Sequence, residues 1–191
     1  MTERTTICVF CGSSINVDQA YRECATEMGR IAGETKIDLI YGGGRVGLMG
    51  LVADAAITAG SRVTGIIPQF LEKREAENPN LHELILTDNM HERKRLMYER
   101  ADAFISLPGG LGTFDETIEV LTWIQLDLLL KPIILVNVKG YWDPFITLVR
   151  HSVSEGFTQT KHAGTMSIVD TPAEALSLVR KPTTISSQIQ N

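Results

Sequence analysis

Ala103-Phe-Ile-Ser-Leu-Pro-Gly-Gly-Leu-Gly-Thr-Phe-Asp-Glu116 is the most informative stretch of this chain. Residues 103–107 predict a short buried strand, Pro108 and the glycines after it predict a sharp turn, and a helical pattern begins at Thr113. Glycines let the backbone approach a ligand that a Cβ atom would block. The first N–H groups of a helix lack intrahelical partners, and together with the positive end of the helix dipole they attract phosphate. The stretch therefore predicts an anion site with the carboxylate of Glu116 beside it.

A capping box is the alternative interpretation of the helix start. In Thr113-Phe-Asp-Glu116 the glutamate fits the position that reaches back to the N–H of the threonine, and Glu116 would then only stabilise the helix. A cap needs one turn residue, whereas this loop has Gly109, Gly110 and Gly112. The additional glycines favour anion binding, but the loop alone leaves the reaction open.

Strand and helix patterns alternate along the rest of the chain. Short apolar runs predict strands at Thr6–Phe10, Ile37–Tyr41, Arg62–Ile67, Glu83–Thr87, Ala103–Leu107, Pro132–Val136 and Thr165–Val169. Helices are predicted at Asp18–Glu34, Leu48–Ala59, His91–Arg100, Thr113–Leu128, Pro144–Glu155 and Pro172–Arg180. Strands that are apolar on both faces and alternate with helices are typical of a parallel sheet covered on both sides. We therefore expect an α/β protein with a single Rossmann-like, three-layer domain over residues 1–180 and a parallel sheet of about seven strands.

Two segments lie outside this alternation. Pro68–Leu81 is rich in Glu, Asn and Pro, and we expect a loop or short helix there at the rim of the sheet. Residues 181–191 are polar, and we expect a flexible C-terminal tail.

Three glycine-bearing loops follow predicted strands: residues 11–14, residues 42–47 and the Pro108 loop. In parallel sheets, ligands bind outside the carboxyl ends of the strands, so these loops are expected along one edge. Gly42-x-Gly44-x-x-Gly47 matches the dinucleotide fingerprint, but the next strand does not end in the acid that would bind the ribose hydroxyls. A mononucleotide or sugar phosphate suits the motif better than NAD, and a tight strand–helix crossing is the alternative.

Composition excludes several classes of protein. With 43% hydrophobic residues, a net charge of −5 and a pI near 5.4, the chain lacks the basic surface that nucleic-acid binding needs. No signal peptide is recognisable, and the longest apolar stretch, 128–138, is too interrupted to span a bilayer. Cys8, Cys11 and Cys24 lack metal-ligand spacing, which indicates reduced thiols in a cytoplasmic protein, and the histidines form no metal motif.

Met90-His-Glu-Arg-Lys-Arg95 places cations at the start of a predicted helix. A solvated helix start with ion pairs is the simpler interpretation. Cations at this end oppose the helix dipole, however, so the pattern also indicates an anion nearby. Arginine is suited to forked contacts with phosphate or carboxylate groups.

Taken together, the motifs resemble the LOG ("Lonely Guy") family. The resemblance rests on Tyr41-Gly-Gly-Gly-x-x-Gly-Leu-Met-Gly50, Met90-His-x-Arg-Lys94 and Pro108-Gly-Gly-x-Gly-Thr-x-x-Glu116, and it extends from about Cys8 to Phe157. Members are cytokinin riboside 5′-monophosphate phosphoribohydrolases, long mislabelled as lysine decarboxylases. They cleave the N-glycosidic bond of AMP-like nucleotides, release free base and ribose 5-phosphate, and usually form dimers with sites near the interface. The resemblance implies no cofactor and no metal.

The resemblance also implies the site residues. Arg93 and Glu116 would be the catalytic pair, with Arg93 holding the base or the phosphate and lowering the pKa of Glu116. The expected substrate-binding residues are Gly12, Ser13, Gly43, Gly44, Glu75, Met90, Lys94, Gly109, Gly110, Leu111, Gly112, Thr113 and Thr122. The chain departs from the family at Arg45, a variable loop position, and at Asp127, where glycine is common.

We therefore expect hydrolysis of cytokinin riboside 5′-monophosphates, and of AMP. A nucleotide-binding sensor without catalysis is the alternative, and a lysine decarboxylase would need pyridoxal phosphate with a Schiff-base lysine. The helix at 113–128 carries Ile118, Leu121, Trp123 and Leu126 on several sides, which indicates either a homodimer interface or a fully buried helix.

Overall fold

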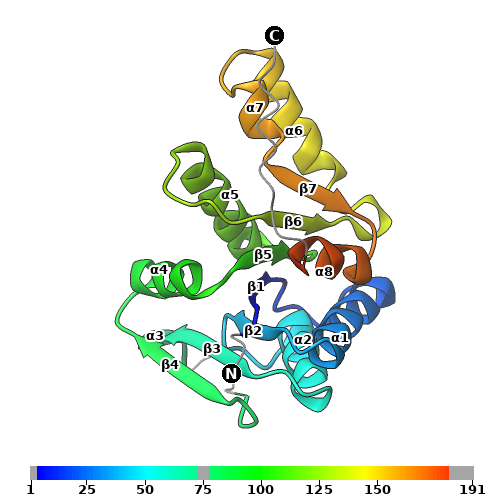
Figure 1. Cartoon of the computed structure of the whole chain (residues 1–191), viewed down its shortest axis with the longest axis vertical. Helices are drawn as coiled ribbons and strands as arrows, with labels where there is room; N and C mark the ends of the chain where they lie inside the picture. Colours follow the sequence, from blue (N-terminus) through cyan, green and yellow to red (C-terminus); the bar gives the residue numbers. More distant parts are fainter. Residues whose placement is uncertain (1–3, 73–77, 181–191) are drawn as a thin grey trace.

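A computed structural model describes residues 4–72 and 78–180 of the chain. Its core is a seven-stranded sheet in the order β4-β3-β2-β1-β5-β6-β7, and every neighbouring pair is parallel (Figure 1). The strands are β1 Thr6–Phe10, β2 Asp38–Tyr41, β3 Val63–Pro68, β4 Glu83–Thr87, β5 Ala103–Ser106, β6 Ile133–Val136 and β7 Met166–Val169. The predicted α/β class and parallel sheet are confirmed.

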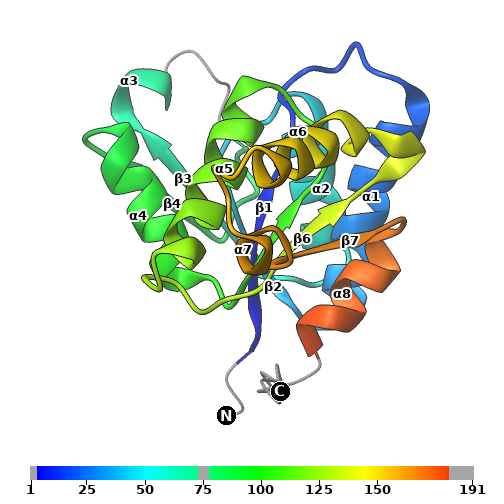
Figure 2. The same cartoon turned by 90° about the horizontal axis from the view of Figure 1, so that it is seen from above.

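Helices cover both faces of the sheet (Figures 1 and 2). Helices α1, α2 and α8 pack on one face, and α4, α5 and α6 pack on the other. The helices are α1 Gln19–Glu34, α2 Gly47–Thr58, α3 Gln69–Glu72, α4 Met90–Arg100, α5 Leu111–Gln125, α6 Asp143–Ser154, α7 Thr160–Ala163 and α8 Pro172–Arg180, with a 3₁₀ turn η1 at Val138–Gly140. This is the expected three-layer arrangement.

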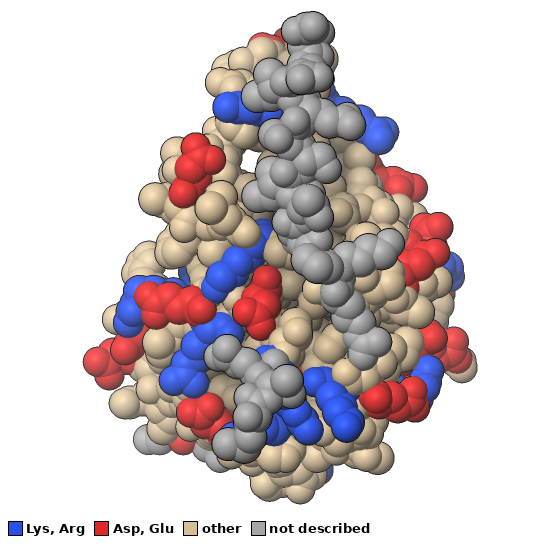
Figure 3. Space-filling view, viewed as in Figure 1, with Lys and Arg blue, Asp and Glu red and all other residues tan. Residues whose placement is uncertain are grey.

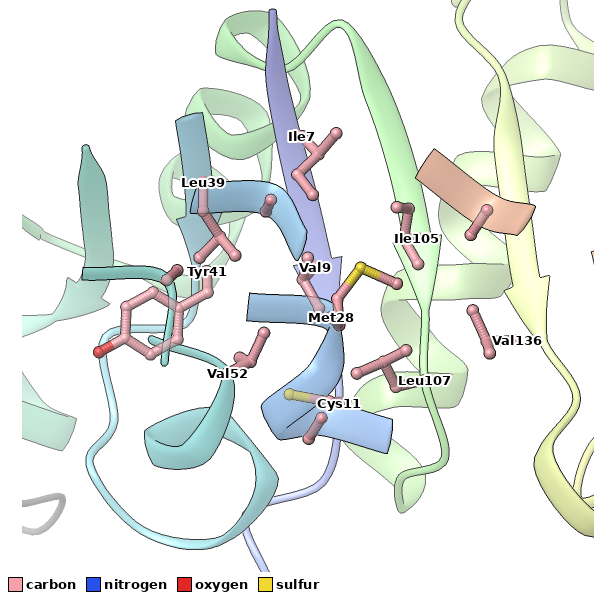
Figure 4. Close-up of a cluster of buried hydrophobic side chains, with 14 of the residues drawn as sticks. Ile7, Val9, Cys11, Met28, Leu39, Tyr41, Val52, Ile105, Leu107 and Val136 are labelled. Atoms are coloured by element: carbon pink, nitrogen blue, oxygen red, sulfur yellow. The ribbon is translucent and has the colours of Figure 1, made fainter. Parts of the chain in front are cut away.

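The central strand shows how the sequence makes a two-faced core. Successive side chains of a strand point to opposite faces, and in β1 both faces are apolar. Ile7 and Val9 enter the cluster under α1 and α2, whereas Cys8 and Phe10 enter the cluster under α4 and α5. Figure 4 shows the first cluster, with Met28 of α1 lying against side chains of β1 and β5.

The sheet order places a topological switch point between β1 and β5. From β1 the chain moves outward through β2, β3 and β4, and then crosses back to β5 on the other side of β1. Gly12 N–H donates to the carbonyl of Pro108 at 3.1 Å, and Leu48 N–H donates to the carbonyl of Gly12 at 2.9 Å. The loops after β1, β2 and β5 therefore meet at one edge, as predicted.

Surface charge on the face drawn in Figure 3 is mixed. Lys and Arg side chains lie among Asp and Glu side chains over the described part of this face. An alternation of this kind gives no single-sign field that would attract a polyanion.

Boundaries differ from the prediction mainly at short elements. The strand β3 continues to Pro68, and α3 then occupies the start of the predicted rim segment. The short helices α3 and α7 were not predicted individually, because one turn gives too little hydrophobic period to detect. The predicted tail, residues 181–191, lies outside the described residues.

The departure at Asp127 is explained by the end of α5. Asp127 has φ 57°, in the left-handed region that glycine adopts without a Cβ penalty and that Asp tolerates better than most residues. Asp127 is exposed and lies beyond the helix. Asp127 therefore adopts, just beyond the end of α5, a backbone conformation that favours glycine.

Candidate active site

A pocket of about 290 Å³ lies at the edge where the glycine loops meet. It lies beside the switch point, where parallel sheets bind ligands. The lining residues are Cys11, Gly12, Ser13, Gly42, Met49, Leu71, Met90, Arg93, Gly110, Leu111, Gly112, Thr113 and Glu116. The structure thus brings nine of the predicted site residues together with four residues that were not among them, Cys11, Gly42, Met49 and Leu71.

Arg93 of α4 and Glu116 of α5 form a buried ion pair in this pocket. Arg93 Nη1 lies 3.1 Å from Glu116 Oε1, and the two side chains are 11% and 10% exposed. Arg93 Nε also donates to the carbonyl of Ile66 at 3.0 Å. The guanidinium is therefore fixed between β3 and α5, and it can present a planar set of donors to a ligand.

Gly42 is the residue that lets Arg93 occupy this position. A Cβ atom at Gly42 would lie 2.4 Å from Arg93 Nη2 and 3.2 Å from Met49 Sδ. The glycine after β2 is therefore required because the arginine side chain passes directly over its backbone. In the sequence, Gly42 was interpreted as part of the glycine motif at residues 42–47. Its contact with Arg93 was not predicted.

We expect Gly42→Ala to lower turnover by about tenfold, because the methyl group displaces the guanidinium, and small displacements of catalytic groups are costly. The melting temperature should change little, since the clashing atom is the end of a flexible side chain. Gly164→Ala is the matched control, because its added Cβ would meet nothing closer than 3.7 Å. Steady-state kinetics of both variants check this prediction, and equal rates in the two would contradict it.

The N-terminus of α5 opens into the same pocket. The helix begins at Leu111 with Gly110 as its N-cap, two residues before the predicted start. Gly110 has no side chain to cap the first N–H groups, and Phe114 is the first residue to donate back, to the carbonyl of Gly110 at 3.0 Å. The N–H groups of residues 111–113 are therefore available to an anion.

The capping-box interpretation is wrong. Thr113 and Glu116 both lie inside α5, so Thr113 cannot be the N-cap. Thr113 is 3% exposed and Glu116 is 8% exposed, and the glutamate pairs with Arg93 instead. A glycine replaces the expected capping side chain, which leaves the helix end open.

Burial raises the pKa of Glu116 above its ordinary value, and the nearby Arg93 cation offsets part of this rise. The expectation that Arg93 lowers the pKa of Glu116 is therefore right for the pairwise effect and wrong for the net direction. A carboxylate whose pKa is raised is a stronger base, which suits a group that must accept a proton from water.

Other predicted residues lie outside the pocket lining. Gly43 has φ 82° and abuts Ile67, so it serves the turn after β2. A Cβ at Gly109 would lie 2.0 Å from Thr113 Oγ1, and Tyr141 OH donates to the Gly109 carbonyl. Gly109 therefore stabilises the loop after β5 and does not line the pocket.

Lys94 and Thr122 also face elsewhere. Lys94 Nζ is bound by Asp115 and Glu119 of α5. Thr122 is exposed, donates to the carbonyl of Ile118 at 2.8 Å and lines a second groove between α5 and α6. Gly44 is buried after β2 but does not line the pocket, and Glu75 lies outside the described residues.

Comparisons with known proteins agree with the motifs. A sequence model of a family described as "Possible lysine decarboxylase" matches residues 49–179. Cytokinin riboside 5′-monophosphate phosphoribohydrolase LOG2 of Arabidopsis thaliana is 47% identical over 154 residues, which are 81% of this chain and 72% of that protein. The chain belongs to the LOG family. The LOG protein of Oryza sativa subsp. japonica is 48% identical over 151 residues, 79% of this chain and 62% of that protein.

Solved structures share the fold of this LOG family member. TM1055 superposes with a TM-score of 0.71 at 24% identity, over 92% of this chain and 98% of that one. The molybdenum cofactor carrier protein of Chlamydomonas reinhardtii gives 0.72 at 18% identity, over 93% and 96% of the two chains. At such identities the likeness concerns the fold alone. None of the helices within residues 4–72 and 78–180 has the length and apolar character to cross a membrane.

Proposed function

We propose that this chain hydrolyses the N-glycosidic bond of cytokinin riboside 5′-monophosphates and of AMP, and releases free base and ribose 5-phosphate. One observation carries the proposal: the buried Arg93–Glu116 pair lies in the same pocket as the uncapped N-terminus of α5. An anion site and a carboxylate with a raised pKa are the two groups that this chemistry needs. The relatives at 47% and 48% identity are named as cytokinin riboside 5′-monophosphate phosphoribohydrolases.

The phosphate is held by the start of α5. The N–H groups of Leu111, Gly112 and Thr113 and the positive end of the helix dipole bind the 5′-phosphate. Holding the phosphate fixes the ribose, so binding energy remote from C1′ is used to orient the reacting carbon.

The bond between C1′ and the base nitrogen breaks while a bond from C1′ to a water oxygen forms. Positive charge develops on the sugar, and the Glu116 carboxylate stabilises that charge. Glu116 also orients the water and accepts its proton, and that proton then passes to the departing base nitrogen, which returns Glu116 to the carboxylate. Arg93 holds Glu116 in place and contacts either the base or the phosphate.

The test compares a nucleotide with its nucleoside. The protein is incubated with AMP, N6-isopentenyl-AMP and the corresponding nucleosides, and free base is measured by chromatography. We expect base from the monophosphates and at least a hundredfold less from the nucleosides, because the phosphate anchor is missing. Base released equally from both would contradict the phosphate-anchor argument.

The alternatives predict different products. A sensor would bind AMP without releasing base. A decarboxylase would need a Schiff-base lysine, but among the described residues no lysine lines the pocket. Carbon dioxide released from lysine in the presence of pyridoxal phosphate would support the decarboxylase.

We also propose that the protein forms a homodimer through α5 and α6. Ile118 and Leu148 are 49% and 62% exposed, and they line one groove of about 260 Å³ between these helices. The alternative of a fully buried helix is wrong, because α5 exposes apolar side chains. Leu111, 85% exposed, lies at the rim of the pocket, so a partner on this face would lie close to the active site.

Light scattering at micromolar concentration should give twice the 21.1 kDa mass of one chain. We expect Ile118→Glu to give monomer, because it places a charge in the groove between the subunits. Leu86→Glu is the control, since Leu86 is similarly exposed, at 43%, but lies on the edge strand β4. A monomeric wild-type protein would remove the dimer proposal.

A further inference from the structure

Tyr141 is the first residue after η1, and its side chain reaches the loop that follows β5. Its hydroxyl donates a hydrogen bond to the carbonyl of Gly109. The tyrosine side chain lines a second cavity, of about 310 Å³. This cavity shares Gly12, Ser13 and Gly110 with the active-site pocket, which the tyrosine does not line. The backbone of Gly110 therefore separates the tyrosine from the active-site pocket.

This hydrogen bond fixes the direction of the peptide bond between Gly109 and Gly110. The peptide is trans and planar, so its C=O and N–H groups point in opposite directions. With the Gly109 carbonyl held by Tyr141, the Gly110 N–H points away from the tyrosine and toward the active-site pocket. Within residues 4–72 and 78–180, this N–H donates to no other group. It therefore adds a fourth donor to the N–H groups of residues 111–113.

The glycines on both sides of this peptide make its orientation easy to change. Without Cβ atoms, Gly109 and Gly110 can reach the flipped orientation at little steric cost. A flipped peptide would turn the Gly109 carbonyl oxygen, with its partial negative charge, toward a bound phosphate. The preceding peptide is held separately, because Gly12 N–H donates to the Pro108 carbonyl at 3.1 Å. The Tyr141 hydroxyl is thus the contact that keeps a donor facing the ligand.

The ring of Tyr141 is held by contacts that do not involve its hydroxyl. It packs edge-on against Tyr21 of α1 and against Trp142, with ring centroids 5.6 and 5.5 Å apart. The turn η1 is itself attached to α1, because Lys139 Nζ lies 2.6 Å from Oδ2 of Asp18, the N-cap of that helix. Removal of the hydroxyl alone should therefore leave the ring in place.

We infer that Tyr141 is a positioning residue for the phosphate site, whose hydroxyl holds the Gly109–Gly110 peptide so that the Gly110 N–H faces the 5′-phosphate. The inference rests on the proposed function, because it takes the ligand of this loop to be a nucleotide phosphate. Tyr141 acts through the peptide and not by touching the substrate. Its effect is therefore confined to ligands that carry a phosphate group.

The test is Tyr141→Phe, which keeps the ring and removes only the hydroxyl. Affinities for AMP and adenosine are measured by calorimetry in a Glu116→Gln background, so that turnover does not consume the ligand. We expect the Kd of AMP to rise about tenfold, because a hydrogen bond to a charged group is weakened. The Kd of adenosine should change less than twofold. Tyr21→Phe is the matched control, since Tyr21 lines the same cavity and its hydroxyl makes no hydrogen bond within the described residues.

Kinetics of the single Tyr141→Phe variant give a second readout. KM for AMP should rise about tenfold with kcat changed less than twofold, because the phosphate contacts are the same in the ground state and the transition state. The calorimetric result is obtained whether or not the protein releases base, so failure of the proposed hydrolysis would be seen separately.

Two calorimetric results would overturn the inference: an unchanged Kd for AMP, or an equal loss of affinity for AMP and adenosine. If Tyr141→Phe does not fold, the Glu116→Gln protein alone is titrated with inorganic phosphate and followed by ¹⁵N NMR. The amide resonance of Gly110 should then move together with those of residues 111–113. A Gly110 resonance that stays in place while the others move would overturn the inference as well.

Discussion

Replacement of Glu116 with glutamine should lower the turnover of AMP by about 10²-fold or more, the range seen for acid–base and electrostatic groups. Glutamine keeps the size of the side chain and can still contact Arg93, 3.1 Å away, but it carries no charge. It can neither stabilise a cationic sugar nor accept a proton from water. Steady-state kinetics with AMP measure the loss.

The folded state should tolerate this change. Because burial raises the pKa of Glu116, ionisation of this group costs stability as the pH rises through that pKa, and the neutral amide removes that cost. The amide also leaves the buried Arg93 cation without its carboxylate, which costs stability. The two effects oppose each other, so we expect a melting temperature close to that of the wild-type protein. Wild-type activity should fall as the pH drops through the raised pKa of Glu116. Near-normal turnover in a folded Glu116→Gln protein would contradict the assignment of Glu116 as a catalytic residue.

Arg93→Lys should lose about as much turnover as Glu116→Gln. Lysine keeps the charge but has no planar fork, so it cannot contact Glu116 and the Ile66 carbonyl together as Arg93 does. Arg93→Ala is a less clean test, because it leaves Glu116 buried without its cation, and breaking such pairs costs about 3–5 kcal/mol.

The matched control for Arg93→Lys is Arg95→Lys, on the same helix but 53% exposed. Kinetics and thermal melting of both variants are compared. Full activity in Arg93→Lys would mean that a simple positive charge is enough, and it would remove the argument for a forked contact.

Sequence patterns predicted the sheet well because its strands depend on local apolar runs. Residues 6–10 were predicted as a strand and form β1 with those bounds, and both of its faces are apolar, as a central parallel strand requires. The start of the helix predicted at Pro172–Arg180 also depends on neighbouring residues, because Glu174 Oε2 accepts from the Thr171 N–H at 3.1 Å. The meeting of the glycine loops followed from the rule that parallel strands end at one edge.

The site was predicted only in part, because its contacts join residues far apart in the chain. The cations of α4 pointed to a nearby anion, and the structure supplies the protein's own carboxylates, Glu116 and Asp115. The close approach of Arg93 to Gly42 depends on how α4 packs on the sheet, which no local pattern contains. The position of Lys94 depends on α5 in the same way.

The stoichiometry of products from AMP tests the central claim most directly. The wild-type protein is incubated with AMP, and adenine and ribose 5-phosphate are each quantified by chromatography, with binding of AMP followed in parallel by calorimetry. Hydrolysis predicts that the two products appear in equal amounts and that the amount of each equals the AMP consumed. It also predicts that Glu116→Gln binds AMP but forms neither product at a comparable rate. Saturable binding of AMP without any free adenine would contradict the account and establish a nucleotide sensor.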